Sequence, residues 1–188
     1  MDVVAVWGQI MRVLRSPKKF FESSKKEKSW KKALPFIMVS AAIGHILTAV
    51  YNIVFSPSIS PEIADTLGIA ETSFTAAEVI PAVIISYIIT IGMSFIWGGA
   101  LKVWLSLFKV ESSYSQSYRV MAYSRTPIYI LSWLPFINLV VALYSFYLMM
   151  VGLTVIYSVS RKKAIVVIVT GVLALAVLSL VFLSFDSV

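Results

Sequence analysis

The stretch VIPAVIISYIITIGMSFIWGGAL, residues 79–101, contains no charged side chain. A helix needs about 20 apolar residues to cross the roughly 30 Å hydrocarbon core of a bilayer. The stretch therefore predicts a transmembrane helix. The rest of the chain agrees with this, because 59% of the 188 residues are hydrophobic and 13% are charged. In soluble domains about 45–50% of residues are apolar and about 25% are charged. We expect an all-α integral membrane protein.

Four further apolar runs are long enough to span a membrane. They are residues 33–55, 118–134, 136–158 and 164–185. The run at 118–134 is the shortest and contains Arg119, Arg125 and Pro127. We predict a polytopic helical bundle with five transmembrane helices over residues 33–188. Small and polar positions are scarce in the last run, so we expect its helix to lie at the periphery of the bundle.

The distribution of Lys and Arg predicts the orientation. Residues 1–32, here called the N-terminal arm, are rich in both, whereas residues 56–78 contain neither and carry acids. Basic residues return at Lys102–Arg119 and at Arg161–Lys163 but are absent from the C-terminal tail. By the positive-inside rule the N-terminus is cytoplasmic and the C-terminus outside the cell membrane. The net charge of +7 then reflects topology and lipid attraction rather than nucleic-acid binding.

The arm begins with a predicted amphipathic helix. Val6, Ile10 and Leu14 fall on its apolar side, and Arg12 and Arg15 fall on the opposite side. Such a helix can lie in the membrane interface or pack on the cytoplasmic ends of the spans, and the pattern allows both. The candidate contacts to anionic lipid headgroups are Arg12, Arg15, Lys18 and Lys19.

The third run places an arginine inside the membrane. Arg125 shares a helical stripe with Tyr118, Tyr129 and Ser132 and lies about 10 Å beyond Tyr118. A charge at that depth is paired, functional or snorkelling. Three interpretations stay open: a side chain that reaches the headgroups, a structural arginine bonded to tyrosines and to carbonyls freed by Pro127, or a site for an anion such as a lipid phosphate.

Polar residues on two other runs extend this candidate intramembrane site. They are His45, Thr48 and Asn52 on the first run and Asn138 on the fourth. His45 is either a proton relay or a neutral imidazole bonded to Thr or Tyr. The chain has no cysteine and one histidine, and no catalytic or nucleotide-binding motif occurs. We therefore expect no enzymatic activity, no cofactor and no metal site.

Two segments resemble the Yip family of membrane proteins. VLRSPKKFFESSKKEKSWKKALPF, residues 13–36, is similar to the family's entry, with a Ser-Pro, a Phe-Phe and a basic spacer before the first span. TPIYILSWLPFINLVVALYSFYLMMVGLTVIYSVSRKKA, residues 126–164, is similar to its later part. The recurring positions there are Pro127, Pro135, Tyr144, Gly152, Ser160, Lys163 and Ala164.

The resemblance implies a domain of five spans with a cytoplasmic N-terminus. It also implies a role in membrane traffic, because eukaryotic members bind Rab-type GTPases and one another. Their Asp-Leu-Tyr-Gly-Pro type motif has no counterpart here, and the short arm is typical of a minimal, prokaryotic-type member.

The sequence thus favours a non-enzymatic membrane protein that organises or recruits at the cytoplasmic face. Its expected partners are the lipid bilayer, anionic lipids, a protein at that face and a second copy of the chain. The alternative is a small permease, channel or lipid-moving protein that uses the polar site around Arg125.

Overall fold

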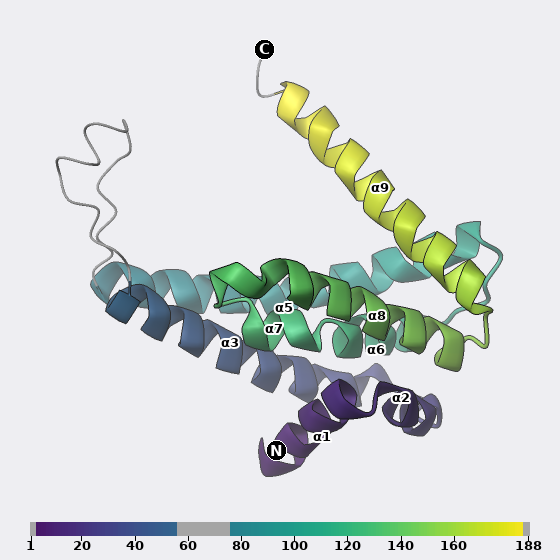
Figure 1. Ribbon diagram of the computed structural model, residues 1–188, viewed down its shortest axis with the longest axis horizontal. Coiled ribbons are helices and arrows are strands. Elements are labelled where there is room, and N and C mark those ends of the chain that lie inside the picture. Colours follow the sequence, from purple (N-terminus) through teal and green to yellow (C-terminus); the bar gives the residue numbers. More distant parts are fainter. Residues whose placement is uncertain (1–2, 56–75, 186–188) are drawn as a thin grey trace.

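The computed structural model describes residues 3–55 and 76–185, and each element there is a helix (Figure 1). The predicted all-α class is confirmed for this part of the chain. Most of the acidic loop and the C-terminal tail, which helped to predict the orientation, lie outside the described residues. The elements are α1 (Val3–Arg15), α2 (Pro17–Lys25), η1 (Trp30–Lys32), α3 (Ala33–Phe55), α5 (Ala76–Leu107), α6 (Tyr114–Ser124), α7 (Thr126–Leu131), η2 (Pro135–Ile137), α8 (Asn138–Ile156) and α9 (Arg161–Phe185).

Four helices among the described residues are long and apolar enough to cross a membrane. These candidate spans are Trp30–Val54, Ala76–Leu107, Asn138–Ile156 and Arg161–Val181. They coincide with four of the five runs predicted from the sequence. Side chains on their outer surfaces are apolar and exposed, as in Ile88 of α5 and Leu139 of α8, which suits contact with lipid rather than with water.

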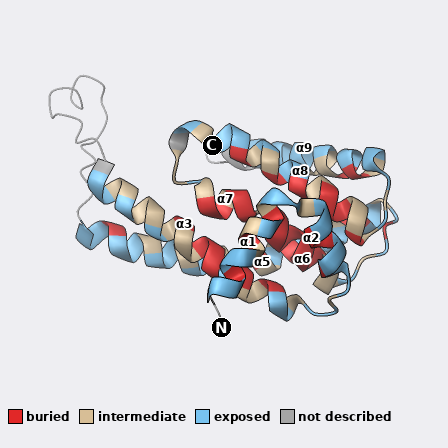
Figure 2. Cartoon of the chain, turned by 60° about the horizontal axis from the view of Figure 1, so that its bottom comes forward, coloured by how far each residue is buried: buried red, intermediate tan, exposed pale blue. Residues whose placement is uncertain are grey.

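The remaining run, 118–134, forms two short helices instead of one. Ser113 and Gln116 start α6 with a reciprocal capping box, and α6 ends at Ser124. α7 begins at Thr126. The pair lies at the centre of the bundle and contacts α3, α5 and α8. Figure 2 colours most of both helices as buried, so this pair of short helices forms a central part of the core.

Pro127 causes the break between α6 and α7. Proline has no amide hydrogen, so the Tyr123 carbonyl four residues earlier loses its helical partner. The Thr126 hydroxyl donates to that carbonyl at 2.6 Å, and Thr126 itself is fully buried. The two neighbouring backbone bonds persist, from the Arg125 amide to Met121 and from the Tyr129 amide to Arg125. The chain therefore bends at Arg125 with the exposed backbone oxygen satisfied.

Glycines let the outer helices approach this pair. A Cβ on Gly44 of α3 would lie 1.7 Å from the Tyr129 carbonyl oxygen. A Cβ on Gly98 of α5 would lie 2.9 Å from the Tyr118 ring. Small residues of this kind allow close backbone contact between helices in membranes.

The N-terminal arm folds against the bundle. Val6, Ile10 and Val13 of α1 are buried, and α1 contacts α3 and α7. In α2, Phe21 is fully buried and lies against Gly152 of α8. Of the two arrangements that the amphipathic pattern allows, the structure has the apolar side of α1 packed on protein.

Helix α9 leaves the bundle at an angle (Figure 1). Near its start Ala164 and Val167 are buried, and the Trp104 indole nitrogen donates to the Val167 carbonyl at 2.9 Å. The described side chains from Val172 to Val181 are exposed. The expected peripheral position of this helix agrees with the structure.

The proline break gives a test of how the core is held together. We expect Thr126→Val to lower the free energy of unfolding by about 0.5–1.5 kcal/mol, because the Tyr123 carbonyl would lose its hydroxyl donor and keep only the cap contact from the Arg125 amide. Pro127→Ala restores the amide, so adding Thr126→Val to Pro127→Ala should cost far less. Thermal unfolding in detergent measures all three variants.

Thr154→Val is the matched control, because the Thr154 hydroxyl donates to Val151 within an unbroken helix. Equal destabilisation by Thr126→Val with and without Pro127 would show that the hydroxyl does not replace the missing amide.

Candidate functional site

Arg125 occupies the junction between α6 and α7 and is half-buried. Its guanidinium carbon lies 4.9 Å from the centre of the Trp97 ring of α5. A cation over an indole face is attracted by the ring quadrupole. The only ion pair among the described residues joins Arg119 to Glu27, so no described carboxylate pairs with Arg125.

A small polar cavity of about 260 Å³ lies on one side of Arg125. Its lining includes Arg125, Tyr129, Ser132, His45 and Thr90. Four of the residues predicted from the sequence therefore come together. The imidazole of His45 has Nδ1 2.8 Å from the Ala41 carbonyl, so Nδ1 carries a proton, and Nε2 lies 3.4 Å from the Thr90 hydroxyl.

The other predicted residues lie elsewhere. The Tyr118 hydroxyl is 3.1 Å from the Ser94 hydroxyl, in the packed contact between α6 and α5. The Thr48 hydroxyl donates to the Gly44 carbonyl of its own helix at 2.9 Å. Asn52 and Asn138 line neither cavity, and Asn138 is exposed at the start of α8. Helical periodicity placed these residues on polar faces, but it does not show which faces meet.

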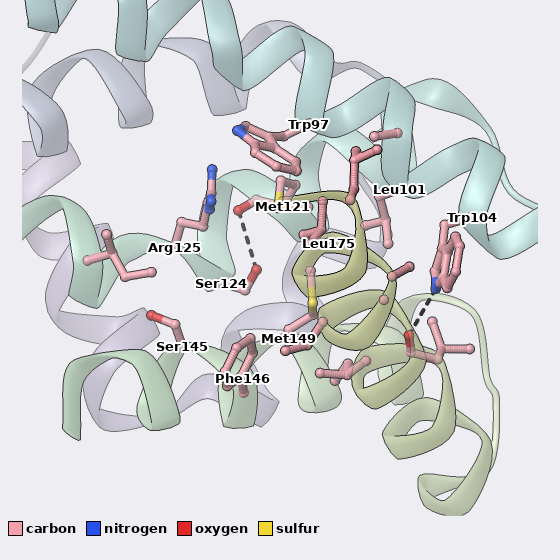
Figure 3. A pocket seen from close by; sticks show the side chains of 18 residues that line it. Trp97, Leu101, Trp104, Met121, Ser124, Arg125, Ser145, Phe146, Met149 and Leu175 are labelled. Atoms are coloured by element: carbon pink, nitrogen blue, oxygen red, sulfur yellow. Dashed lines mark hydrogen bonds between the residues drawn. The ribbon is translucent and has the colours of Figure 1, made fainter. Parts of the chain in front are cut away.

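A larger cavity of about 540 Å³ also borders Arg125 and lies between α5, α6, α8 and α9. Most of its lining is apolar, including Met149 and Leu175. Its polar lining includes Arg125, Ser124 and Ser145. Figure 3 shows Arg125 and Ser145 toward one end and Trp104 toward the other.

Arg119 is a structural residue that the site prediction missed. It is 2% exposed, and its guanidinium donates to the Ser24 carbonyl and, at 3.3 Å, to the Ser115 carbonyl. Its Nη1 lies 3.9 Å from Glu27 of the arm. The sequence offered one weak signal, namely an acid at position 27 within a strongly basic segment.

Further bonds attach the arm to the bundle. The Tyr123 hydroxyl donates to Glu27 at 3.3 Å, and the Ser115 hydroxyl donates to the Lys28 carbonyl at 3.0 Å. The Lys25 ammonium donates to the Ser158 hydroxyl at 2.9 Å. On α8, the Tyr144 hydroxyl donates to the Leu14 carbonyl. We call these contacts, with those of Arg119, the arm clamp.

Four basic side chains of the arm take no part in this clamp. Arg12, Arg15, Lys18 and Lys19 are exposed on α1 and α2. The Arg12 guanidinium makes a local bond to the Gly8 carbonyl at 3.4 Å. Their exposure leaves them available to headgroups or to a protein.

The described residues contain no group of three His, Cys, Asp or Glu side chains that could hold a metal ion. The two cavities at Arg125 share one cationic side chain and otherwise offer hydroxyl, indole and imidazole groups. This arrangement suits binding of an anion.

The arm clamp can be tested by proteolysis. We expect Arg119→Met to release the arm from the bundle, because the Ser24 carbonyl would lose a charge-assisted hydrogen bond of about 1.5–3 kcal/mol. Trypsin should then cut at Lys25–Lys32 at least several-fold faster than in the unchanged protein. Arg12→Gln, which removes an exposed charge, is the control, and an unchanged cutting rate in Arg119→Met would contradict the clamp.

The comparisons with known proteins agree with the described fold. A family model described as the Yip1 domain matches residues 11–183. No curated protein matches the chain, and no solved structure does. The matched region runs from within α1 to near the end of α9. Because it covers almost the whole chain, the chain belongs to the Yip1-domain family of membrane proteins.

Proposed function

We propose that the chain is a non-enzymatic membrane protein that organises or recruits at the cytoplasmic membrane face, in a role like that of membrane-traffic proteins of the Yip type. The observation that best supports this proposal is the arm clamp. It holds the arm against the bundle through buried Arg119 while Arg12, Arg15, Lys18 and Lys19 stay exposed.

A folded arm suits recruitment better than a free tail. A free basic tail loses conformational entropy on binding, whereas a folded one has already lost it. Each basic residue near an anionic membrane surface contributes about 1 kcal/mol. Trp7 is 45% exposed on α1, and an indole at this position suits the headgroup region. The proposed partners are anionic lipids, a protein at this face and a second copy of the chain.

The proposal includes a fifth crossing of the cell membrane by α6 and α7. Together they run from Tyr114 to Leu131, about 27 Å at 1.5 Å per residue, which is close to the roughly 30 Å core. With this crossing, the basic segments 1–32, 102–119 and 161–163 fall on the cytoplasmic side and the C-terminus falls outside.

A permease is the weaker proposal. The two cavities at Arg125 contain no second charged side chain among the described residues. A polar path for a solute would need further groups along its length.

The topology is testable because the chain has no cysteine. We expect single cysteines at Glu111 and Lys162 to react only with reagent on the cytoplasmic side, and one at Phe136 only with reagent outside. Phe136 is 95% exposed, so its label is accessible. If Glu111→Cys and Phe136→Cys react from the same side, α6 and α7 do not cross.

The recruiting surface is tested by neutralising Arg12, Arg15, Lys18 and Lys19 to glutamine together. We expect the lipid shell extracted with the protein in polymer-bounded discs to lose its enrichment in phosphatidylglycerol over the bulk membrane. Cross-links from the arm to neighbouring proteins should fall in parallel.

The control variant changes the same number of charges elsewhere, with Lys102, Lys109, Arg161 and Lys162 replaced by glutamine. An arm variant that keeps both the phosphatidylglycerol enrichment and the cross-links would refute the proposal.

A further inference from the structure

The 540 Å³ cavity lies where α9 separates from the bundle. Leu175 and Leu178 of α9 line one side of it, and Phe146 and Met149 of α8 line another. Its volume falls within the range of about 300–1,000 Å³ that is typical of ligand sites. In a membrane protein, a cavity with such an apolar lining suits a hydrocarbon chain.

One polar group in this cavity has no hydrogen-bond partner among the residues that the structure describes. The Ser145 hydroxyl is buried and makes no hydrogen bond, and Ser145 is 5% exposed. Other helical hydroxyls, such as those of Ser40, Thr48 and Ser124, donate to a carbonyl of their own helix. A buried hydroxyl without a partner costs about 1–3 kcal/mol, so Ser145 is poised for a partner from outside the chain.

Arg125 gives the same end of the cavity its charge. Its guanidinium has five N–H donors, and the described contacts give it the Trp97 ring and the Tyr129 hydroxyl but no carboxylate. Figure 3 draws Arg125 and Ser145 on the same side of the view, away from Trp104. The cavity therefore combines an apolar body with a cationic, hydroxyl-bearing end.

We propose that this cavity binds an amphiphilic anion with an acyl chain. The carboxylate or phosphate accepts hydrogen bonds from Arg125 and Ser145, and the chain lies between α8 and α9. A free fatty acid and an anionic phospholipid share this chemistry. The site is separate from the arm surface, so the proposal does not depend on recruitment at the cytoplasmic face.

Photo-cross-linking in nanodiscs of neutral phosphatidylcholine tests the site. The two probes are palmitate and phosphatidylglycerol, each with a diazirine in the acyl chain. We expect cross-links on Met149 and Leu175 with at least one probe, and competition by the unlabelled anion but not by hexadecanol. Cross-linking by palmitate alone identifies a fatty-acid site, and cross-linking by phosphatidylglycerol alone identifies a phospholipid site.

Variants separate the two halves of the site. Arg125→Gln should weaken binding about tenfold or more, as expected for loss of a charge-assisted hydrogen bond, whereas Arg125→Lys should retain part of it. Lys162→Gln is the control for loss of charge. Leu175→Trp should fill the cavity and block cross-linking, while Leu180→Trp, on the same helix but outside the cavity lining, should not.

Three results would each overturn the proposal. The first is cross-linking that persists unchanged in both Arg125→Gln and Leu175→Trp. The second is competition by hexadecanol as strong as that by the anion, because it would show that the cavity accepts any hydrocarbon chain. The third is absence of cross-links with both probes.

Discussion

The hydrogen bond from the Thr126 hydroxyl to the Tyr123 carbonyl permits a bent helix at the centre of a membrane bundle. Backbone groups in hydrocarbon need partners within the protein, and Pro127 removes one. With the carbonyl satisfied, α6 and α7 can change direction at Arg125 and still fill the space between α3, α5 and α8. Gly44 approaches Tyr129 of α7 and Gly98 approaches Tyr118 of α6, so both close contacts depend on the position of α6 and α7.

Two arginines six positions apart have different environments because of this bend. Arg119 belongs to α6 and is enclosed by backbone carbonyls and by Glu27 of the arm. Arg125 is at the break between α6 and α7 and lines both cavities. Arg119 stabilises the fold by joining segments that are distant in the sequence. Arg125 keeps guanidinium N–H groups that can donate to a ligand.

The sequence predicted the features that depend on local chemistry. Apolar length located α3, α5, α8 and α9, and the stripe around Arg125 grouped it with Tyr129 and Ser132. The presence of Pro127 explained why a carbonyl would need a new partner. Arg119 and Ser145 were not found in this way, because their significance depends on partners that they have or lack across helices. Ser24 is 95 positions from Arg119, and no periodicity within one helix reveals such a contact.

The departure of α9 from the bundle also affects the surrounding bilayer. The helix is held by Trp104 near its start and extends away from the other helices toward its C-terminal end (Figure 1). The described helices are therefore spread more widely at that end than at the end where α9 begins (Figure 1). An inclusion with unequal area in the two leaflets is wedge-shaped, and many such wedges at high density favour a bent membrane over a flat one.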